Sequence, residues 1–100
     1  MTLLYVSGPM SNMPGHNFPA FDAAALLLRR AGHVVINPAD RGIVYGWAWE
    51  DYLRRDLAEM LECDGVAVLP GWADSRGASL EVHVARALSM PVKAVEGWIA

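Results

Sequence analysis

Two acidic residues occupy positions where the helical pattern of the sequence calls for apolar side chains. Asp56 lies on the apolar face of a predicted helix over residues 49–62, and Glu81 lies beside or within the apolar face of another over residues 78–89. The other members of these faces are Trp49, Tyr52, Leu53, Leu57 and Met60 in the first helix, and Leu80, Val84, Ala85 and Leu88 in the second. A carboxylate is costly on a core-facing stripe unless it is paired or used in function.

Paired acids suit transfer or hydrolysis at a glycosidic centre. One carboxylate attacks the anomeric carbon, and a second carboxyl with a raised pKa protonates or orients the leaving group. A structural interpretation is also open, because Asp56 can pair with Arg54, Arg55 or Arg86. Glu81, in the first turn of its predicted helix, can be a boundary residue that the helix dipole favours. Since two separate helices break the same rule, we favour function for the pair.

No other set of residues in the sequence competes with these acids for a catalytic role. There is no G-x-G-x-x-G and no P-loop. His16, His33 and His83 show no metal-ligand spacing, so we expect neither a metal nor another cofactor. Cys63 follows a predicted helix and precedes a strand, where packing is the expected role.

The helices alternate with short apolar segments that are predicted to form strands. The expected strands are residues 3–6, 33–37, 64–70 and 91–95, and a further helix is expected over 18–31, capped by Asn17 and ended by Gly32. This order predicts an α/β fold with three layers, in which a mainly parallel sheet of four to five strands carries helices on both faces. Ligands of such sheets bind beyond the carboxyl ends of the strands, so the loops after Val6, Asn37 and Leu69 should hold the chemistry.

The loop over residues 75–79 meets the start of the last predicted helix. Free backbone N–H groups there, with the hydroxyls of Ser75 and Ser79, suit an anion such as phosphate. An ordinary serine N-cap accounts for the same residues equally well.

The composition limits the class of protein and its partners. The 100 residues carry no linker and predict a single domain over 1–100. Apolar residues make up 54% of the chain, against about 45–50% in typical domains, which favours a homo-oligomer over an apolar monomer. A net charge of −3 without a basic cluster argues against nucleic acid, and no apolar run approaches a membrane span. One cysteine and the lack of a signal peptide predict a cytoplasmic protein.

Most of the chain resembles the nucleoside 2-deoxyribosyltransferase-like family, in particular its small phage and bacterial branch. The similar segments are LYVSGPM, NPAD, WEDYLRRDLAEMLECDGVAVLPGW and SRGASLEVHVA. Their specific parts are Y-x-x-G-P near the N-terminus and S-x-G-A-x-x-E before the last helix. The resemblance implies a flavodoxin- or Rossmann-like fold with an active site at the carboxyl edge of the sheet.

The resemblance also implies roles for individual residues. Glu81 matches the family's nucleophilic glutamate, which forms a covalent deoxyribosyl–enzyme ester. Asp56 matches an aspartate that assists the departing base, and Tyr5 matches a tyrosine whose hydroxyl orients the nucleophile. Gly8, followed by Pro9, lies in the loop that approaches the sugar.

The substrate loop departs from the nucleoside transferases. These enzymes carry a base-reading Asp where this chain has Ser75, with Asp74 one residue earlier. The related 2'-deoxynucleoside 5'-monophosphate N-hydrolase has Ser and Gly at the positions of Ser75 and Gly77, where both contact phosphate. The hydrolase's phosphate-binding Arg falls at Ser11 here. Of the tryptophans near this edge, we expect Trp72 to lie close to the ligand.

The expected function is cleavage or transfer at the N-glycosidic bond of 2'-deoxynucleosides or their 5'-monophosphates, through a covalent glutamyl-deoxyribose intermediate. A non-catalytic nucleotide-binding or sensing module on the same fold is the main alternative, and a purely structural oligomer is a third. The expected partner is a small-molecule nucleoside or nucleotide, and both a dimer and a tetramer are compatible with the sequence.

Overall fold

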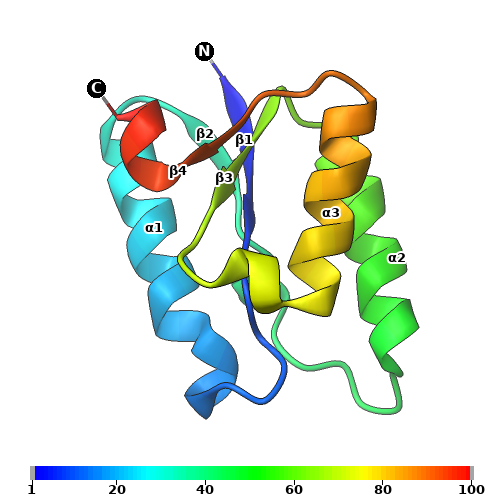
Figure 1. Cartoon of the computed structure of the whole chain (residues 1–100). Coiled ribbons are helices and arrows are strands. Elements are labelled where there is room, and N and C mark those ends of the chain that lie inside the picture. Colours follow the sequence, from blue (N-terminus) through cyan, green and yellow to red (C-terminus); the bar gives the residue numbers. More distant parts are fainter. Residues whose placement is uncertain (1, 100) are drawn as a thin grey trace.

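A parallel four-stranded sheet forms the middle layer of the fold, which we describe over residues 2–99 from a computed structural model (Figure 1). Its strands are β1 (Leu3–Ser7), β2 (Val34–Ile36), β3 (Gly65–Val68) and β4 (Val92–Ala94). They lie in the order β2-β1-β3-β4, with every neighbouring pair parallel. This arrangement confirms the expected α/β fold and places β1 and β3 in the centre of the sheet.

Three helices cover the sheet, with α1 (Phe18–Arg30) on one face and α2 (Trp49–Met60) and α3 (Arg76–Ala87) on the other (Figure 1). Short 3-10 turns at Pro14–Asn17, Pro38–Arg41, Trp72–Asp74 and Val95–Trp98 complete the described structure. The sequence pattern did not predict these turns, because three or four residues are too few to show a period. Over residues 2–99, no helix combines the length and the hydropathy that crossing a lipid bilayer would require.

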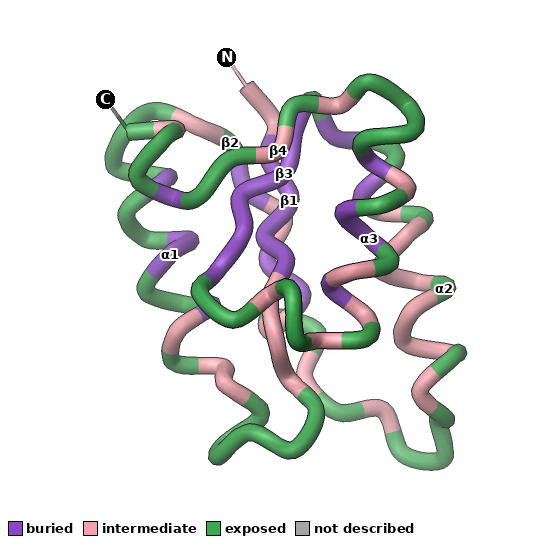
Figure 2. Tube along the Cα trace, in the orientation of Figure 1, coloured by how far each residue is buried: buried purple, intermediate pink, exposed green. Residues whose placement is uncertain are grey.

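Alternating side chains of β1 build the two halves of the core. Leu4 and Val6 are fully buried against α1, whereas Tyr5 belongs to the cluster beneath α2 and α3. This follows from the strand geometry, because successive side chains point to opposite faces of a sheet. Figure 2 shows buried residues along the two central strands, β1 and β3, and on the inner faces of α1 and α3. The face of β1 that carries Tyr5 is the one that matters for the candidate site.

The buried face of α3 differs from the predicted one. Ala78, Glu81, Val82 and Ala85 are buried, at the spacing of one helical stripe. Leu80 and Leu88, which the sequence analysis placed on the core-facing stripe, are 37% and 57% exposed. Two apolar stripes overlap on this helix, and the smaller residues face inward. Glu81 therefore lies in the middle of the buried face.

The start of the last helix and the cap of the first also need correction. The last helix begins at Arg76 rather than at residue 78, so Glu81 lies in its second turn. Asn17 does not cap α1 with its side chain, since its Nδ2 donates instead to the carbonyl oxygen of Pro9 at 2.9 Å. Gly32 does follow the end of α1, where its φ of +96° lies in the region that favours glycine.

Candidate active site

The carboxylate of Glu81 receives one hydroxyl group on each of its oxygens. Tyr5 Oη donates to Oε2 at 2.8 Å, and Ser7 Oγ donates to Oε1 at 2.6 Å. Tyr5 and Ser7 are two residues apart on β1, so both side chains point to the face that α3 covers. The three side chains are nearly inaccessible, with exposures of 1%, 1% and 5% for Tyr5, Ser7 and Glu81. Two side chains of β1 thus hold the buried carboxylate of α3 by hydrogen bonds.

Burial and hydrogen bonding act in opposite directions on this acid. Burial raises the pKa of Glu81 to about 7, the hydrogen bonds from Ser7 and Tyr5 act to lower it, and the charge of Asp56 acts to raise it. The pKa of Tyr5 lies well above its usual value because of burial and then the charge of Glu81, so Tyr5 remains a neutral donor. Near neutral pH, both protonation states of Glu81 are therefore populated, and its ionised form is held in one orientation.

Asp56 shows features of both interpretations that the sequence left open. It lines the same pocket as Glu81. It also forms an ion pair with Arg55, whose Nε lies 3.2 Å from Oδ1 of Asp56. Burial raises the pKa of Asp56, and Arg55 acts to lower it. Asp56, which is predicted to assist the leaving group, is thus both partly buried and engaged in an ion pair.

The pocket around these acids has a volume of about 900 Å³, within the range of about 300–1,000 Å³ that is usual for small-molecule sites. The loops that follow β1, β2 and β3 all contribute to it, as expected for a parallel sheet. It brings together the three predicted catalytic residues and five of the predicted substrate-binding residues: Tyr5, Asp56, Glu81, Gly8, Pro9, Asp74, Ser75 and Gly77.

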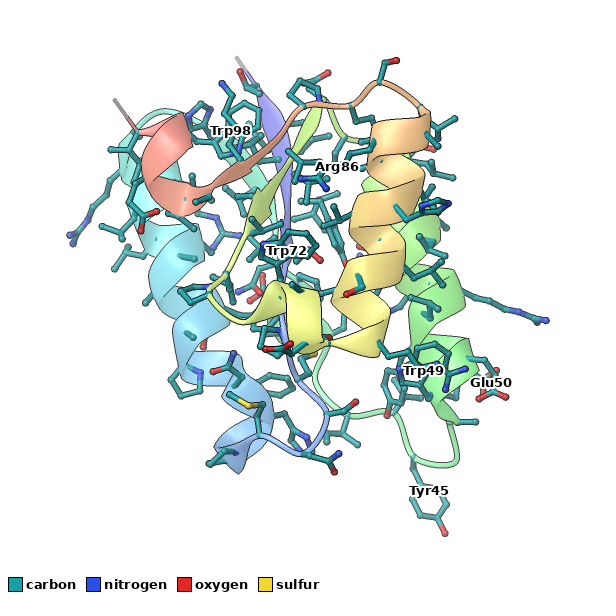
Figure 3. All side chains as sticks on the ribbon, viewed as in Figure 1. Tyr45, Trp49, Glu50, Trp72, Arg86 and Trp98 are labelled. Atoms are coloured by element: carbon teal, nitrogen blue, oxygen red, sulfur yellow. The ribbon has the colours of Figure 1, made fainter. Side chains whose placement is uncertain are left out.

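Trp72 is the one predicted substrate-binding residue that does not line this pocket. It belongs to the 3-10 turn Trp72–Asp74 and packs against the apolar cluster beneath α2 and α3. Figure 3 shows its indole beside Arg86, whose guanidinium carbon lies 5.5 Å from the ring centroid. Trp49 lines the pocket instead, at the start of α2, with the guanidinium carbon of Arg76 at 3.9 Å from its ring. Trp72 thus lies outside the lining of this pocket, and its closeness to a ligand stays a prediction.

The structure gives a different reason for the residue type at each of three predicted substrate-binding positions, Gly8, Gly77 and Ser75. A β-carbon on Gly8 would lie 2.7 Å from Cβ of Leu69, so only glycine fits where these two strand ends approach. A β-carbon on Gly77 would meet only Trp49, at an ordinary contact distance of 3.7 Å. Ser75 Oγ accepts a hydrogen bond from the N–H of Ala78 at 3.2 Å, which is the ordinary N-cap that the sequence left as one alternative.

Ser7 and Arg55 are the site residues that sequence reasoning missed. The expected strand over residues 3–6 ends before Ser7, whereas β1 includes it. The available signal was the period of two along β1, which places Ser7 on the same face as Tyr5. Arg55 was considered only as a structural partner of Asp56.

Other reactive groups do not add to the site. Across residues 2–99, no three side chains of His, Cys, Asp or Glu come together in a way that could hold a metal ion. Cys63 is buried in the cluster beneath α2 and α3, and burial raises the pKa of its thiol to about 11. A protonated, enclosed thiol is a poor nucleophile.

Comparisons with known proteins agree with the fold. A family model described as "Domain of unknown function (DUF4406)" matches residues 2–94. A solved structure of a 2-deoxyribosyltransferase from the psychrotolerant bacterium Bacillus psychrosaccharolyticus is similar, with a TM-score of 0.70 and 22% sequence identity. The similarity covers 90% of this chain and 69% of that one, and at this identity it shows a shared fold. No curated protein matches the sequence.

Proposed function

Because the chain belongs to the DUF4406 family, whose description assigns no activity, we propose a function from its own site. We propose that the protein cleaves or transfers at the N-glycosidic bond of 2'-deoxynucleosides or of their 5'-monophosphates. The observation that carries this proposal is the buried carboxylate of Glu81, which accepts hydroxyls on both oxygens at the wall of a ligand-sized pocket. A carboxylate in such an environment suits nucleophilic attack on a sugar carbon.

The proposed reaction has two steps. A carboxylate oxygen of Glu81 attacks C1' of the deoxyribose, and the bond from C1' to the base nitrogen breaks with its electron pair leaving on the base. Asp56 lies in the same pocket and supplies a proton to the departing base or orients it. Water or a second base then attacks C1' and loses its proton to Asp56 or to the departed base. The bond from C1' to Glu81 breaks in this step, which restores the carboxylate. Hydrolysis and base exchange differ only in this acceptor.

Tyr5 and Ser7 have a defined task in this scheme. Their hydroxyls fix both oxygens of Glu81, so the nucleophile needs no reorientation when substrate arrives. The pKa of about 7 leaves a substantial ionised fraction at neutral pH, and its basicity makes that fraction more reactive than an ordinary carboxylate. The likeness to a structure named as a 2-deoxyribosyltransferase supports a nucleoside or nucleotide as the ligand class.

A non-catalytic nucleotide-binding module is the second candidate. The ion pair between Asp56 and Arg55 favours it, because an acid that is already paired is less free to transfer a proton. The use of Ser75 as a helix cap also gives that residue a structural role. This candidate predicts ligand binding in the same pocket without release of a base.

Chromatography of released base separates the two candidates. Wild type, Glu81→Ala and Glu81→Gln are incubated with 2'-deoxynucleosides and their 5'-monophosphates, with and without a second free base. Glu50→Ala is the matched control, because Glu50 is an exposed acid on α2 (Figure 3). The enzyme proposal expects release by wild type and by the control but not by the Glu81 variants. Binding by wild type in a thermal-shift assay, without release from any substrate, would support the binding module.

A further inference from the structure

Asp56 belongs to a row of alternating charges that leads away from the pocket. Arg55 Nε lies 3.2 Å from Oδ1 of Asp56 and 3.8 Å from Oε1 of Glu59. The other oxygen of Glu59 is 2.7 Å from Nη2 of Arg41, in the 3-10 turn that follows β2. The side chains of Asp56, Glu59 and Arg55 are only 14%, 18% and 19% exposed. Ion pairs at this depth are screened less by salt than surface pairs.

Two aromatic rings hold the guanidinium of Arg55 in place. Its central carbon lies 5.2 Å from the ring of Trp47 and 5.6 Å from that of Tyr52, and these rings meet edge to face. Tyr52 Oη accepts from the N–H of Val44 at 2.9 Å and donates to its carbonyl oxygen at 3.0 Å. The loop before α2 is thereby fastened to the helix, and Arg55 is confined between the rings and the two acids.

We propose that Arg55 is a positioning residue that determines which oxygen of Asp56 is available to a ligand and in which protonation state Asp56 meets it. Arginine is charged at all accessible pH values, so its Nε always donates and Oδ1 of Asp56 always accepts. A proton on Asp56 must therefore sit on Oδ2. None of the hydrogen bonds found within residues 2–99 ends on Oδ2 of Asp56, and because Asp56 lines the pocket we assign this oxygen to the ligand.

The charged groups around Asp56 explain why Arg55 affects the protonation of this acid. On its own helix Arg55 acts to lower the pKa of Asp56 and Glu59 acts to raise it, and Arg41 acts to lower it from the neighbouring turn. Across the pocket, the charge of Asp56 acts to raise the pKa of both Glu81 and Tyr5. Arg55 is the nearest cation in this set, so it biases the division of protons between the two acids of the site.

The catalytic consequence rests on the proposed function, whereas the effect on Asp56 does not. The chain offers a matched control, because Arg54 precedes Arg55 on the same helix, is exposed and forms no ion pair among the described residues. Arg55→Met and Arg54→Met remove the same charge from adjacent positions. Arg55→Gln is the second variant should the methionine disturb folding, and Arg55→Lys keeps the charge but loses the Nε donor.

The decisive measurement is a titration of the Asp56 carboxyl carbon by NMR in each variant. We expect the pKa of Asp56 to be higher in Arg55→Met and Arg55→Gln than in wild type and Arg54→Met, because the nearest cation is gone. Equal values in the Arg55 and Arg54 variants would overturn the proposal. This titration needs no turnover, so it remains decisive if base release is never found and the proposed function fails.

Base release against pH gives the second readout. The limb of the profile that belongs to Asp56 should move to higher pH in Arg55→Met, whether the acid acts protonated or ionised. Release at the optimum pH of each variant should fall by about tenfold or more, because Asp56 is no longer held in orientation. Arg55→Lys should restore the position of that limb but not the full rate, since only the charge returns. An active Arg55→Met with the profile and rate of Arg54→Met would refute the positioning role.

Discussion

The hydroxyl of Tyr5 donates to Glu81 at 2.8 Å although the two residues are 76 positions apart in the sequence. Neither group has such a partner in the unfolded chain, so this contact and that of Ser7 exist only in the folded protein. The candidate site consequently depends on tertiary contacts between β1 and α3. The stability of the fold and the ionisation of Glu81 are therefore linked.

Replacement of Tyr5 by Phe tests this link. The change removes one of the two hydrogen bonds to Glu81 and should cost about 1.5–3 kcal/mol where the carboxylate is ionised, and about 1 kcal/mol where it is protonated. Urea denaturation at pH 8 and pH 5 measures both values, with the fully exposed Tyr45 changed to Phe as the control. An equal loss at both pH values would show that the hydroxyl does not stabilise the charge.

The raised pKa of Glu81 predicts how stability depends on pH. Since the folded protein holds this proton up to about pH 7 and the unfolded chain only up to about 4.5, the folded state binds more protons between these values. The contribution is fully present below pH 4.5 and is lost as the pH rises towards 7, by about 3 kcal/mol in total. Denaturation across this window should show a decline in the free energy of unfolding. In Glu81→Gln the decline should be smaller, and what is left should come from Asp56, whose pKa is also raised.

Asp56→Asn tests whether Asp56 assists the leaving group, because it removes the acid and keeps a side chain of similar size. If Asp56 assists the leaving group, base release should fall by about 10²–10⁴-fold. The pKa of Glu81 should fall as well, because the charge of Asp56 acts to raise it. Release assays together with NMR titration of Glu81 measure the two effects. Glu62→Gln, at an exposed acid after α2, should change neither; a drop in release as large as that of Asp56→Asn would point to net charge instead.

The sequence predicted the local features of this protein better than the directions of its side chains. The order of strands and helices follows from short-range apolar patterns, and Glu81 stood out because it breaks one. The outward position of Leu80 and the inward position of Ala78 depend on how closely α3 approaches the sheet, which is a property of the packed structure. Likewise, a 3-10 turn decides where the indole of Trp72 points, and such a turn has no period to detect.

Gly8 and Gly77, two of the glycines that line the pocket, should respond differently to an added methyl group. Gly8→Ala should destabilise the fold by about 1–3 kcal/mol, because the new carbon would overlap Leu69. Gly77→Ala has room inside a helix and should be neutral or stabilising by up to about 1 kcal/mol. Thermal denaturation gives both values. A folded Gly77→Ala that no longer binds nucleotide would support its place in the ligand site, and unchanged binding would remove it from that site.

The apolar composition predicts a dimer or a tetramer. Leu80 and Leu88 are exposed in the single chain, so they are available to contacts between subunits. Sedimentation equilibrium measures the mass directly against the 10.9 kDa of one chain. A mass of one chain at micromolar concentration would contradict the prediction and assign the apolar surplus to the surface of a monomer.

Because Tyr5 and Ser7 reach Glu81 from alternate positions of one strand, both hydrogen bonds form only when β1 is in the correct register. A slip of β1 by one residue would turn Leu4 and Val6 towards α3 and send both hydroxyls to the side of α1. Glu81 would then be buried without either hydroxyl donor, and its ionised form would lose the two hydrogen bonds that stabilise it. The ionisation of Glu81 therefore depends on the register of β1, so one titrating carboxyl reports how this central strand is placed in the sheet.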